Sequence, residues 1–292
     1  MRHIILISGK DSLSTAIVQK AKEPTFDYEY IFNPTGAELP EVDKWLAKVE
    51  IYLDAKIERV GADLLGIIKG YNFLPSSRAR YCTRQSKIEP LEKFLKGSDA
   101  TVYYGLRYDE PERVGYDNSK NQSITPDYPL RDAKMTIAMV WALLGRLDLL
   151  PPQFIWHDMI ARVRALMADN SGIIDTLHPW ELAPLFGWRT RPNCYFCFFQ
   201  RQYEFIGLFE HHPDLFWKAV ELEENTGAEG YTLQSGYSLR SLLPRADEIK
   251  ERRAKAIAKM LYSLAQKPLF LDGDGEYGDE LAVNSCGLYC GK

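Results

Sequence analysis

Short apolar runs alternate with segments of helical spacing along the first half of the chain. Residues 4–7 (Ile-Ile-Leu-Ile) form a continuous apolar run, as expected of a strand that is buried on both faces of a parallel sheet. Residues 28–32 and 101–104 have the pattern of two further strands, and apolar positions recur at helical spacing from Leu39 to Val49. This alternation predicts an α/β fold with a mainly parallel sheet.

The strand pattern fades beyond about residue 130, where helical spacing predominates. The predicted helix over residues 244–266 has a favourable N-terminal end. Pro244 suits a first helical turn, and acidic residues follow near the positive end of the helix dipole. The pair Pro151-Pro152 marks a boundary between an α/β domain over residues 1–150 and a mostly helical, cysteine-bearing region over residues 151–292. Helices are expected over residues 134–146, 155–167, 200–224 and 244–266.

Composition and charge narrow the class of protein. The chain has 292 residues, of which 46% are hydrophobic and 26% charged, the composition of an ordinary globular protein. Its net charge of −4 provides no overall attraction to nucleic acid or to an anionic membrane. The longest apolar run, residues 137–144, is too short to span a bilayer, and the N-terminus has no signal-peptide pattern. We therefore expect a soluble cytoplasmic protein with no membrane partner.

The segment Ser8-Gly9-Lys10-Asp11-Ser12 follows the first strand and opens a helix. Amide groups at a helix N-terminus bind anions, the serine hydroxyls add donors, Gly9 allows close approach, and Lys10 adds a positive charge. The same residues also fit a simple helix cap, for which Ser and Asp are common. By itself, the pattern leaves a phosphate-binding loop and a cap equally open.

Three further segments share a known order with this loop. The loop resembles the Ser-Gly-Gly-Lys-Asp-Ser signature of PP-loop (adenine nucleotide alpha-hydrolase-like) enzymes, with one glycine fewer. The later segments resemble those of the phosphoadenosine phosphosulfate (PAPS) reductase family within that superfamily. They are Asn33-Pro34-Thr35-Gly36, then Tyr81-Cys82-Thr83 with Lys87 and Glu89-Pro90-Leu91, then Gly105-Leu106-Arg107 with Glu110 and Arg113.

The resemblance implies a PP-loop/HUP-like, mainly parallel sheet flanked by helices, and it implies a site for an adenine nucleotide. Lys10 and Asp11 become candidate catalytic residues. For any single basic residue a solvated surface charge is the simpler interpretation, but their clustering inside the motifs favours an anionic substrate. The expected nucleotide-binding residues are Ser8, Gly9, Lys10, Asp11, Ser12, Asn33, Thr35, Gly36, Lys87, Gly105, Arg107 and Arg113.

Five cysteines are candidates for metal or sulfur chemistry: Cys82, Cys194, Cys197, Cys286 and Cys290. Their odd number and the missing secretion pattern argue against a disulfide framework. The Cys-x-x-Cys spacing at Cys194 and Cys197 suits two ligands of one metal ion or cluster, whereas a pair of buried thiols is the simpler alternative. Together with Cys286 and Cys290, these two cysteines would make a four-thiolate site. By spacing alone, such a site fits zinc and an iron–sulfur cluster equally well.

The resemblance favours a [4Fe-4S] cluster, with Cys82, Cys194, Cys197 and Cys290 as its ligands. The tail segment Cys286-Gly287-Leu288 resembles the Cys-Gly-Leu-His tail that carries the nucleophile of PAPS reductases, although Tyr289-Cys290 replaces the histidine. Cys286 is therefore the candidate catalytic thiol, which would attack a sulfonyl sulfur and then be regenerated by a thiol reductant. The alternative interpretation makes Cys286 and Cys290 a pair of metal ligands.

Three functions follow from these patterns. The first is reduction of a sulfonucleotide, PAPS or APS, by a thiol reductant. The second is an ATP- and Mg²⁺-dependent transfer of sulfur, supplied by a cysteine desulfurase, to DNA or tRNA. It would need a nucleic-acid surface such as the basic helix over residues 245–259, whose commoner explanation is a solvated face with i,i+4 ion pairs. The third is a non-catalytic nucleotide-binding or zinc-clamped interaction protein.

Overall fold

The computed structural model describes residues 1–116, 122–152, 154–189, 191, 193–227 and 231–265. The chain divides into two compact units. Among these described residues, unit 1 comprises Met1–Pro152 together with residues 191, 193 and 194, and unit 2 comprises residues 154–189, 195–227 and 231–265. The return of residues 191–194 brings Cys194 into unit 1, which no pattern in the sequence indicates.

Unit 1 is built on a five-stranded sheet in the order β3-β2-β1-β4-β5, and every neighbouring pair of strands is parallel. This confirms the predicted α/β fold with a mainly parallel sheet. The central strand β1 places Ile4 opposite Glu29 of β2 and opposite Val102 of β4. The strands are β1 (Arg2–Leu6), β2 (Tyr28–Phe32), β3 (Ile57–Arg59), β4 (Ala100–Tyr103) and β5 (Ile124–Asp127).

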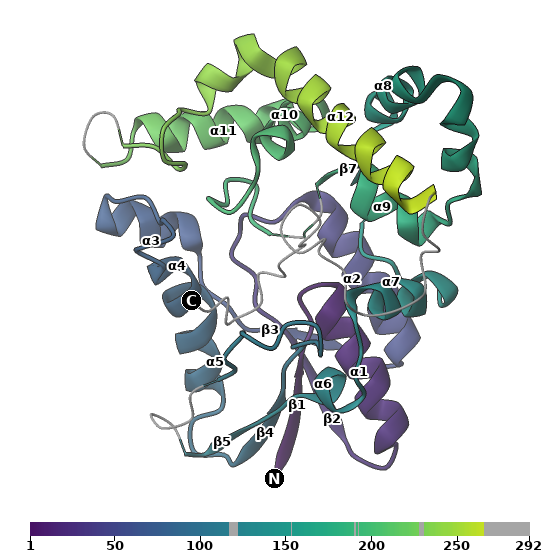
Figure 1. Ribbon diagram of the computed structural model, residues 1–292. Coiled ribbons are helices and arrows are strands. Elements are labelled where there is room, and N and C mark those ends of the chain that lie inside the picture. The colour runs from purple at the N-terminus through teal and green to yellow at the C-terminus, as the bar shows by residue number, and fades with distance from the viewer. Residues whose placement is uncertain (117–121, 153, 190, 192, 228–230, 266–292) are drawn as a thin grey trace. The chain divides into compact units, whose positions relative to one another are not determined.

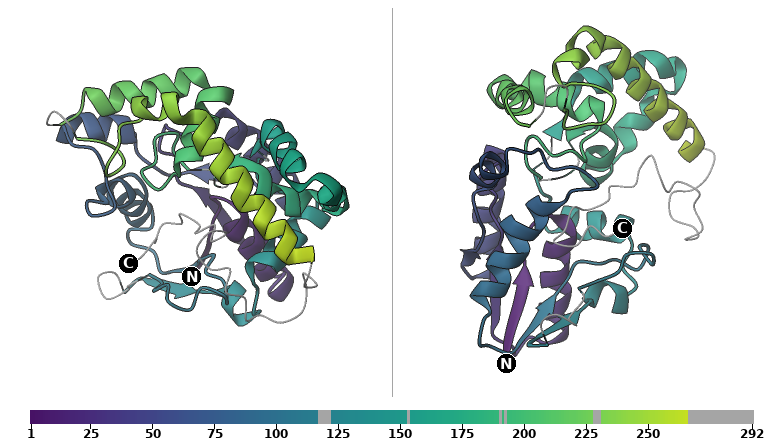
Figure 2. Two further views of the ribbon diagram at one scale, coloured as in Figure 1. Left: turned by 45° about the horizontal axis from the view of Figure 1, so that its top comes forward. Right: turned by 90° about the vertical axis from the view of Figure 1, so that its left-hand side faces the viewer.

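Helices cover both faces of this sheet, as Figures 1 and 2 show. Ile5 and Ile7 belong to the core on the face covered by α1 (Lys10–Lys22), α2 (Pro40–Leu53) and α7 (Ile137–Arg146). Ile4 and Leu6 belong to the core on the other face, which α5 (Glu89–Phe94) covers. Because successive residues of a strand point to opposite faces, the continuous apolar run in β1 fills both cores at once.

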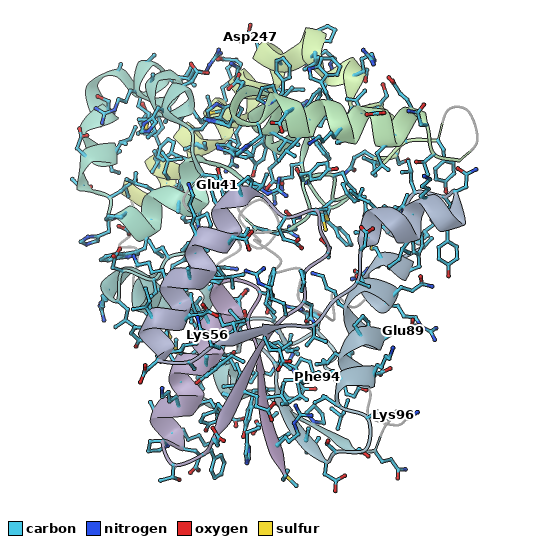
Figure 3. The ribbon with its side chains drawn as sticks, turned by 180° about the vertical axis from the view of Figure 1, so that it is seen from behind. Glu41, Lys56, Glu89, Phe94, Lys96 and Asp247 are labelled. Carbon is cyan, nitrogen blue, oxygen red and sulfur yellow. The ribbon has the colours of Figure 1, made fainter. Side chains whose placement is uncertain are left out.

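The elements between β3 and β4 follow closely on one another. They are α3 (Leu64–Tyr71), the short helix α4 (Tyr81–Thr83), the π-helical turn η1 (Arg84–Ile88) and α5, and the last three are continuous. Figure 3 shows Phe94 at the end of α5 beside the sheet, where its ring lies 4.7 Å below the guanidinium of Arg2. The short helix α6 (Pro129–Asp132) precedes α7.

Unit 2 is mostly helical, as expected. Its helices are α8 (His157–Met167), η3 (Ala168–Thr176), α9 (Pro179–Phe186), α10 (Gln202–His211), α11 (Pro213–Glu224), η4 (Arg240–Arg245) and α12 (Ala246–Ala265). A small antiparallel pair, β6 (Phe154–Ile155) and β7 (Gly187–Arg189), accompanies them. None of the helices in the described ranges is long and apolar enough to cross a membrane.

Two helix boundaries in unit 2 differ from expectation. The predicted helix over residues 200–224 is two helices, α10 and α11, because Pro213 cannot donate an amide bond and instead starts the second helix. The predicted start at Pro244 is also wrong. Pro244 lies in the 3₁₀ turn η4, and α12 begins two residues later, at Ala246.

Candidate functional site

The loop after β1 lies where the sheet order changes direction. The neighbours of β1 are β2 on one side and β4 on the other, so β1 and β4 lie at the point where the strand order reverses. In open α/β sheets, ligands bind at this place, outside the carboxyl ends of the strands. The Ser8–Ser12 loop follows β1, and the Gly105–Arg107 segment follows β4, so the fold brings the two predicted motifs to the same edge.

The Ser8–Ser12 loop is organised by the Ser12 hydroxyl. Its oxygen accepts hydrogen bonds from the amides of Ser8, at 2.8 Å, and Gly9, at 3.0 Å, and the hydroxyl donates to the Gly9 carbonyl at 2.9 Å. Gly9 has a φ of 169°, which is extended backbone that any residue adopts. Ser12 therefore closes the loop, while the first turn of α1 begins at Lys10 with no side-chain cap among the described residues. The capping role expected of these residues is thus performed from inside the helix.

Four buried charged side chains form what we call the switch-point cluster: Lys10, Asp11, Arg107 and Glu110. Each is less than a tenth exposed. The Asp11 carboxylate receives hydrogen bonds from Lys10 Nζ at 2.9 Å and from Arg107 Nη1 at 3.0 Å. Arg107 also lies 3.3 Å from Glu110. Two cations and two carboxylates therefore offset one another in the interior of unit 1.

Burial and pairing set the protonation of this cluster. Burial lowers the pKa of Lys10, although the charge of Asp11 opposes the change. Burial alone would raise the pKa of Asp11, but the positive charges of Lys10 and Arg107 outweigh it, so the pKa of that carboxyl is lowered. Burial likewise opposes the charge of Arg107, and Asp11, Glu110 and Asp109 reverse the effect, so its pKa is raised. Asp11 and Arg107 are therefore held as an ion pair.

The segment that follows β4 passes close to the backbone of the first turn of α1. A Cβ atom added to Gly105 would lie 2.9 Å from the Asp11 carbonyl carbon and 2.9 Å from the Ser12 amide nitrogen. Only a residue without a side chain fits at this position unless the backbone moves. The sequence motif therefore has a geometric reason: Gly105 lets the two loops meet, and this contact brings Arg107 onto Asp11.

Arg113 is held beside the cluster by Glu110, with its Nη1 atom 3.1 Å and 3.0 Å from the two carboxylate oxygens. A residue absent from the sequence-based set, Arg131 of α6, donates to the backbone carbonyls of Glu110 and Arg113 and so fixes this segment. Trp141 of α7 was also not expected here. Its ring centroid lies 5.9 Å from the Lys10 ammonium, within the range of a cation–π contact.

A second group of predicted residues lies at the end of β2. The Thr35 hydroxyl donates to Glu38 at 2.6 Å and lies 3.2 Å from the sulfur of Cys194. Glu38 also accepts the Thr35 amide at 2.8 Å, and Asn33 donates its side-chain amide to the Val60 carbonyl at 2.6 Å. Asn33 and Thr35 are thus committed to building the turn, in which Gly36 has a φ of 74° that favours glycine.

Cys82 of α4 and Lys87 of the π-helical turn η1 belong to one continuous helical segment. The Glu89 amide bonds to the carbonyl of Arg84, five residues back, which brings residues five apart toward one face. Pro90 explains the turn, because it has no N–H to offer the Ser86 carbonyl, which accepts the Ala62 amide at 3.2 Å instead. Cys82 and Lys87 are five residues apart, and both act electrostatically on Cys194.

The protonation of Cys194 follows from these neighbours. Burial raises the pKa of its thiol to about 11; Lys87 and the Thr35 hydrogen bond oppose the rise, while Glu38 and Cys82 add to it. Cys82 and Cys194, which we call the thiol pair, are near enough for the charge of Cys82 to act on the Cys194 thiol. Within the described ranges no three His, Cys, Asp or Glu side chains come together as a metal site. Cys286 and Cys290 lie outside the described residues, so the pair fits half of a four-thiolate set.

Comparison with known proteins identifies relatives but no activity. No family model matches the chain. Two uncharacterised proteins of Methanocaldococcus jannaschii are similar to it. One is 34% identical over 103 residues, which are 34% of this chain and 21% of that protein. The other is 24% identical over 259 residues, which are 83% of this chain and 53% of that protein. The matched part of this chain thus spans about half the length of the second relative and 21% of the first.

Among solved structures, a phosphoadenylyl-sulfate (PAPS) reductase from Candida auris in a phosphate complex is similar at a TM-score of 0.39 and 17% identity. The match covers 51% of this chain and 73% of that chain. A match at this level establishes neither the fold nor the function of this chain.

Most of the predicted site residues gather at one edge of unit 1. The switch-point cluster contains Lys10, Asp11 and Arg107, with Arg113 beside it, and the thiol pair lies with Thr35 and Lys87. Cys197 belongs to unit 2, three residues along the chain from Cys194. The residues that sequence reasoning missed, Arg131 and Trp141, act through contacts with residues distant in sequence, and no local motif marks them.

Proposed function

We propose that unit 1 binds an adenine nucleotide at the switch point and couples it to sulfur chemistry at the thiol pair, as in the PAPS reductase family that its motifs resemble. The observation that carries this proposal is the fit of Gly105 against the Asp11–Ser12 peptide. Three motif segments come to the carboxyl edge of one parallel sheet, at the place where such sheets bind nucleotides. Independent structural reasons thus support a resemblance first drawn from sequence.

The charges of the switch-point cluster suit an anionic ligand that competes for cations. Lys10 and Arg107 are both already paired with Asp11. An incoming phosphate or sulfate would share these cations and also receive the amide groups of the first turn of α1. Asp11 then has a second role, because its carboxylate offsets the buried charges of Lys10 and Arg107 before an anion binds.

The reaction that we favour is reduction of a sulfonucleotide. A cysteine thiolate attacks the sulfonate sulfur, the bond from sulfur to the phosphate oxygen breaks, and the nucleotide leaves with that oxygen. The sulfonate is then bound to the cysteine sulfur, and a dithiol reductant releases it as sulfite while being oxidised to a disulfide. Cys286 is the proposed nucleophile, and a [4Fe-4S] cluster would be held in part by the thiol pair.

A second reaction, ATP-dependent transfer of sulfur to nucleic acid, is favoured by one specific observation. Residues 64–88, which carry Cys82 and Lys87, contain five basic residues and no acidic one. Such a segment suits a polyanionic substrate better than a single nucleotide. In this reaction Mg²⁺ would accompany ATP, and a cysteine desulfurase would supply the sulfur.

Calorimetric titration with PAPS, APS and ATP·Mg²⁺ tests the nucleotide site. We expect one of these ligands to bind the full chain, and we expect Lys10→Met to weaken the binding at least tenfold. Lys56→Met is the matched control, since the Lys56 side chain is 93% exposed in the same unit. Equal binding by both variants, or no binding by the wild type, would refute the nucleotide site.

Metal analysis of anaerobically purified protein tests the sulfur chemistry. Iron and acid-labile sulfide with broad visible absorbance would support a cluster, and Cys82→Ser and Cys194→Ser should each reduce the iron content. Stoichiometric zinc without iron would instead indicate a structural clamp. The redox part of the proposal would then be withdrawn, and the nucleotide site would stand or fall on the titration alone.

A further inference from the structure

Residues 64–88 differ in charge from the rest of the chain. They contain Lys69, Arg78, Arg80, Arg84 and Lys87 but neither Asp nor Glu. At the chain average of 40 acidic residues in 292, a stretch of 25 residues would hold about three. The chain as a whole has a net charge of −4, so this local excess of positive charge is not a property of the composition. A segregated basic segment is an electrostatic footprint for a polyanion.

The fold gathers this segment into one surface of unit 1. Helix α3 packs against both α4 and the π-helical turn η1, so cations distant in sequence share one region. Lys69 and Arg78 are exposed, and neither forms an ion pair with any of the described residues. Arg84 pairs with Glu89 at 2.8 Å, but both side chains are about half exposed or more, and such surface pairs are weak. A phosphate could therefore replace Glu89 at Arg84.

Aromatic rings lie among these cations. The Tyr71 and Tyr81 rings have centroids 4.9 Å apart, and the ring of Phe73 lies 6.5 Å from that of Tyr81. Tyr81 is anchored by a hydrogen bond from its hydroxyl to the Phe73 carbonyl, whereas Tyr71 is 54% exposed. An exposed ring that rests on a fixed ring offers a platform to a planar base, and cations around such a platform follow the backbone of a single strand.

We infer that residues 64–88 bind single-stranded nucleic acid, with Tyr71 stacking on a base and Arg78 and Arg84 contacting phosphates. This inference rests on the second of the two proposed reactions, transfer of sulfur to nucleic acid, and narrows its substrate to a single strand, because Cys82 and Lys87 belong to the same segment and both act electrostatically on Cys194. A strand held on this surface runs beside the thiols. A duplex would fit poorly, since its bases are already stacked and are not available to Tyr71.

Fluorescence anisotropy of the full chain with labelled 20-nucleotide DNA and RNA oligomers tests this surface. We expect the single strands to bind at least tenfold more tightly than the duplex of the same sequence. Tyr71→Ala should weaken the binding about tenfold, and Arg78→Ala should weaken it severalfold and reduce the salt dependence by about 0.7 in the slope of log K against log salt. The DNA and RNA arms show which backbone is preferred.

Two control variants match these changes. Tyr52 is 43% exposed on α2, and Lys56 is 93% exposed next to β3. Figure 3 shows Lys56 apart from Glu89, which borders the basic segment. Tyr52→Ala and Lys56→Ala should change the affinity less than twofold. If they weaken binding as much as Tyr71→Ala and Arg78→Ala, or if the wild type prefers duplex or binds neither strand, the inference is wrong.

The nucleotide titration separates this inference from the proposed function. Binding of ATP or PAPS without binding of any oligomer would leave the proposed function standing and remove the nucleic-acid surface. Binding of oligomers that depends on Tyr71 and Arg78, without binding of any nucleotide, would support the surface and refute the nucleotide site. Tyr71 and Arg78 are both exposed, so their variants are expected to keep the wild-type circular dichroism and unfolding midpoint.

Discussion

Arg107 donates a hydrogen bond of 3.0 Å to the carboxylate of Asp11, which lies 96 positions earlier in the chain. Both side chains are about 95% buried, so their charges have little contact with water. The pair links the segment after β4 to the first turn of α1 and therefore joins two motifs of the candidate nucleotide site. Removing Arg107 therefore measures how much this buried pair stabilises unit 1.

Arg107→Met should destabilise unit 1 strongly. The substitution leaves the buried carboxylates of Asp11 and Glu110 without their shared guanidinium, and breaking a buried ion pair costs about 3–5 kcal/mol. Urea unfolding at neutral pH measures the loss. The control is Lys48→Ala, whose partner Asp148 has a side chain 94% exposed, and this change should cost no more than about 1 kcal/mol. Equal losses from the two variants would contradict the role assigned to the buried pair.

The same carboxylate gives the stability a specific pH dependence. The cations Lys10 and Arg107 outweigh the effect of burial and lower the pKa of Asp11 in the folded chain. A lowered acidic pKa stabilises the fold above the unfolded value of about 3.9, and the contribution is lost as the pH falls through the folded value. Wild type should therefore be more stable than Asp11→Asn at pH 7, and the difference should shrink below about pH 4. A difference that stays constant from pH 7 to pH 3 would disprove this linkage.

Gly105→Ala should disturb both stability and ligand binding. The new methyl group would lie 2.9 Å from backbone atoms of Asp11 and Ser12, which cannot rotate away as a side chain could. We expect a loss of about 1–3 kcal/mol and a weaker affinity for the nucleotide that the titration identifies. Gly70→Ala provides the opposite case. Nothing lies within 4 Å of its added Cβ in helix α3, so it should stabilise the chain by about 0.4–1 kcal/mol.

The sequence predicts those parts of unit 1 that depend on local pattern. Residues 28–32 were expected as a strand and form β2 with the same bounds, because a short apolar run bounded by turn residues has few other stable arrangements. The sequence also predicts correctly that the Ser8–Ser12 loop follows the end of one strand, β1, and that Gly105 follows the end of another, β4. Buried strands and special backbone positions leave marks in the sequence because each is dictated by nearby residues.

Features that depend on contacts distant in sequence could not be predicted in this way. Nothing around Cys194 indicates that residues 191–194 belong to unit 1, where the Cys194 sulfur lies 3.2 Å from the Thr35 hydroxyl. The contact of Trp141 with Lys10 joins α7 to α1, and neither helix carries a motif for it. The helix start predicted at Pro244 is wrong because proline favours a first helical turn but also suits the 3₁₀ turn that precedes α12. The chemistry of the site thus depends on pairings that only the fold supplies.

Thr35→Val should release Cys194 from the strand end. The Thr35 hydroxyl donates to Glu38 at 2.6 Å, so its oxygen is left to accept the hydrogen of the Cys194 thiol, and valine provides neither interaction. Leaving the partners unsatisfied costs about 1–3 kcal/mol. Thr35→Ser keeps the hydroxyl and should restore most of this stability, which separates the hydrogen bonds from the packing of the methyl group.

Alkylation followed by peptide mass spectrometry checks the same change at the thiol. With the hydroxyl removed, the segment carrying Cys194 opens more readily, so Cys194 in metal-free Thr35→Val should react severalfold faster than in wild type at a fixed pH. Thr35→Ser should react at nearly the wild-type rate. Cys82, which belongs to α4 and not to the turn that Thr35 builds, serves as the internal reference. Equal acceleration of both cysteines would show general unfolding, and an unchanged Cys194 rate would show that Thr35 does not hold this thiol in place.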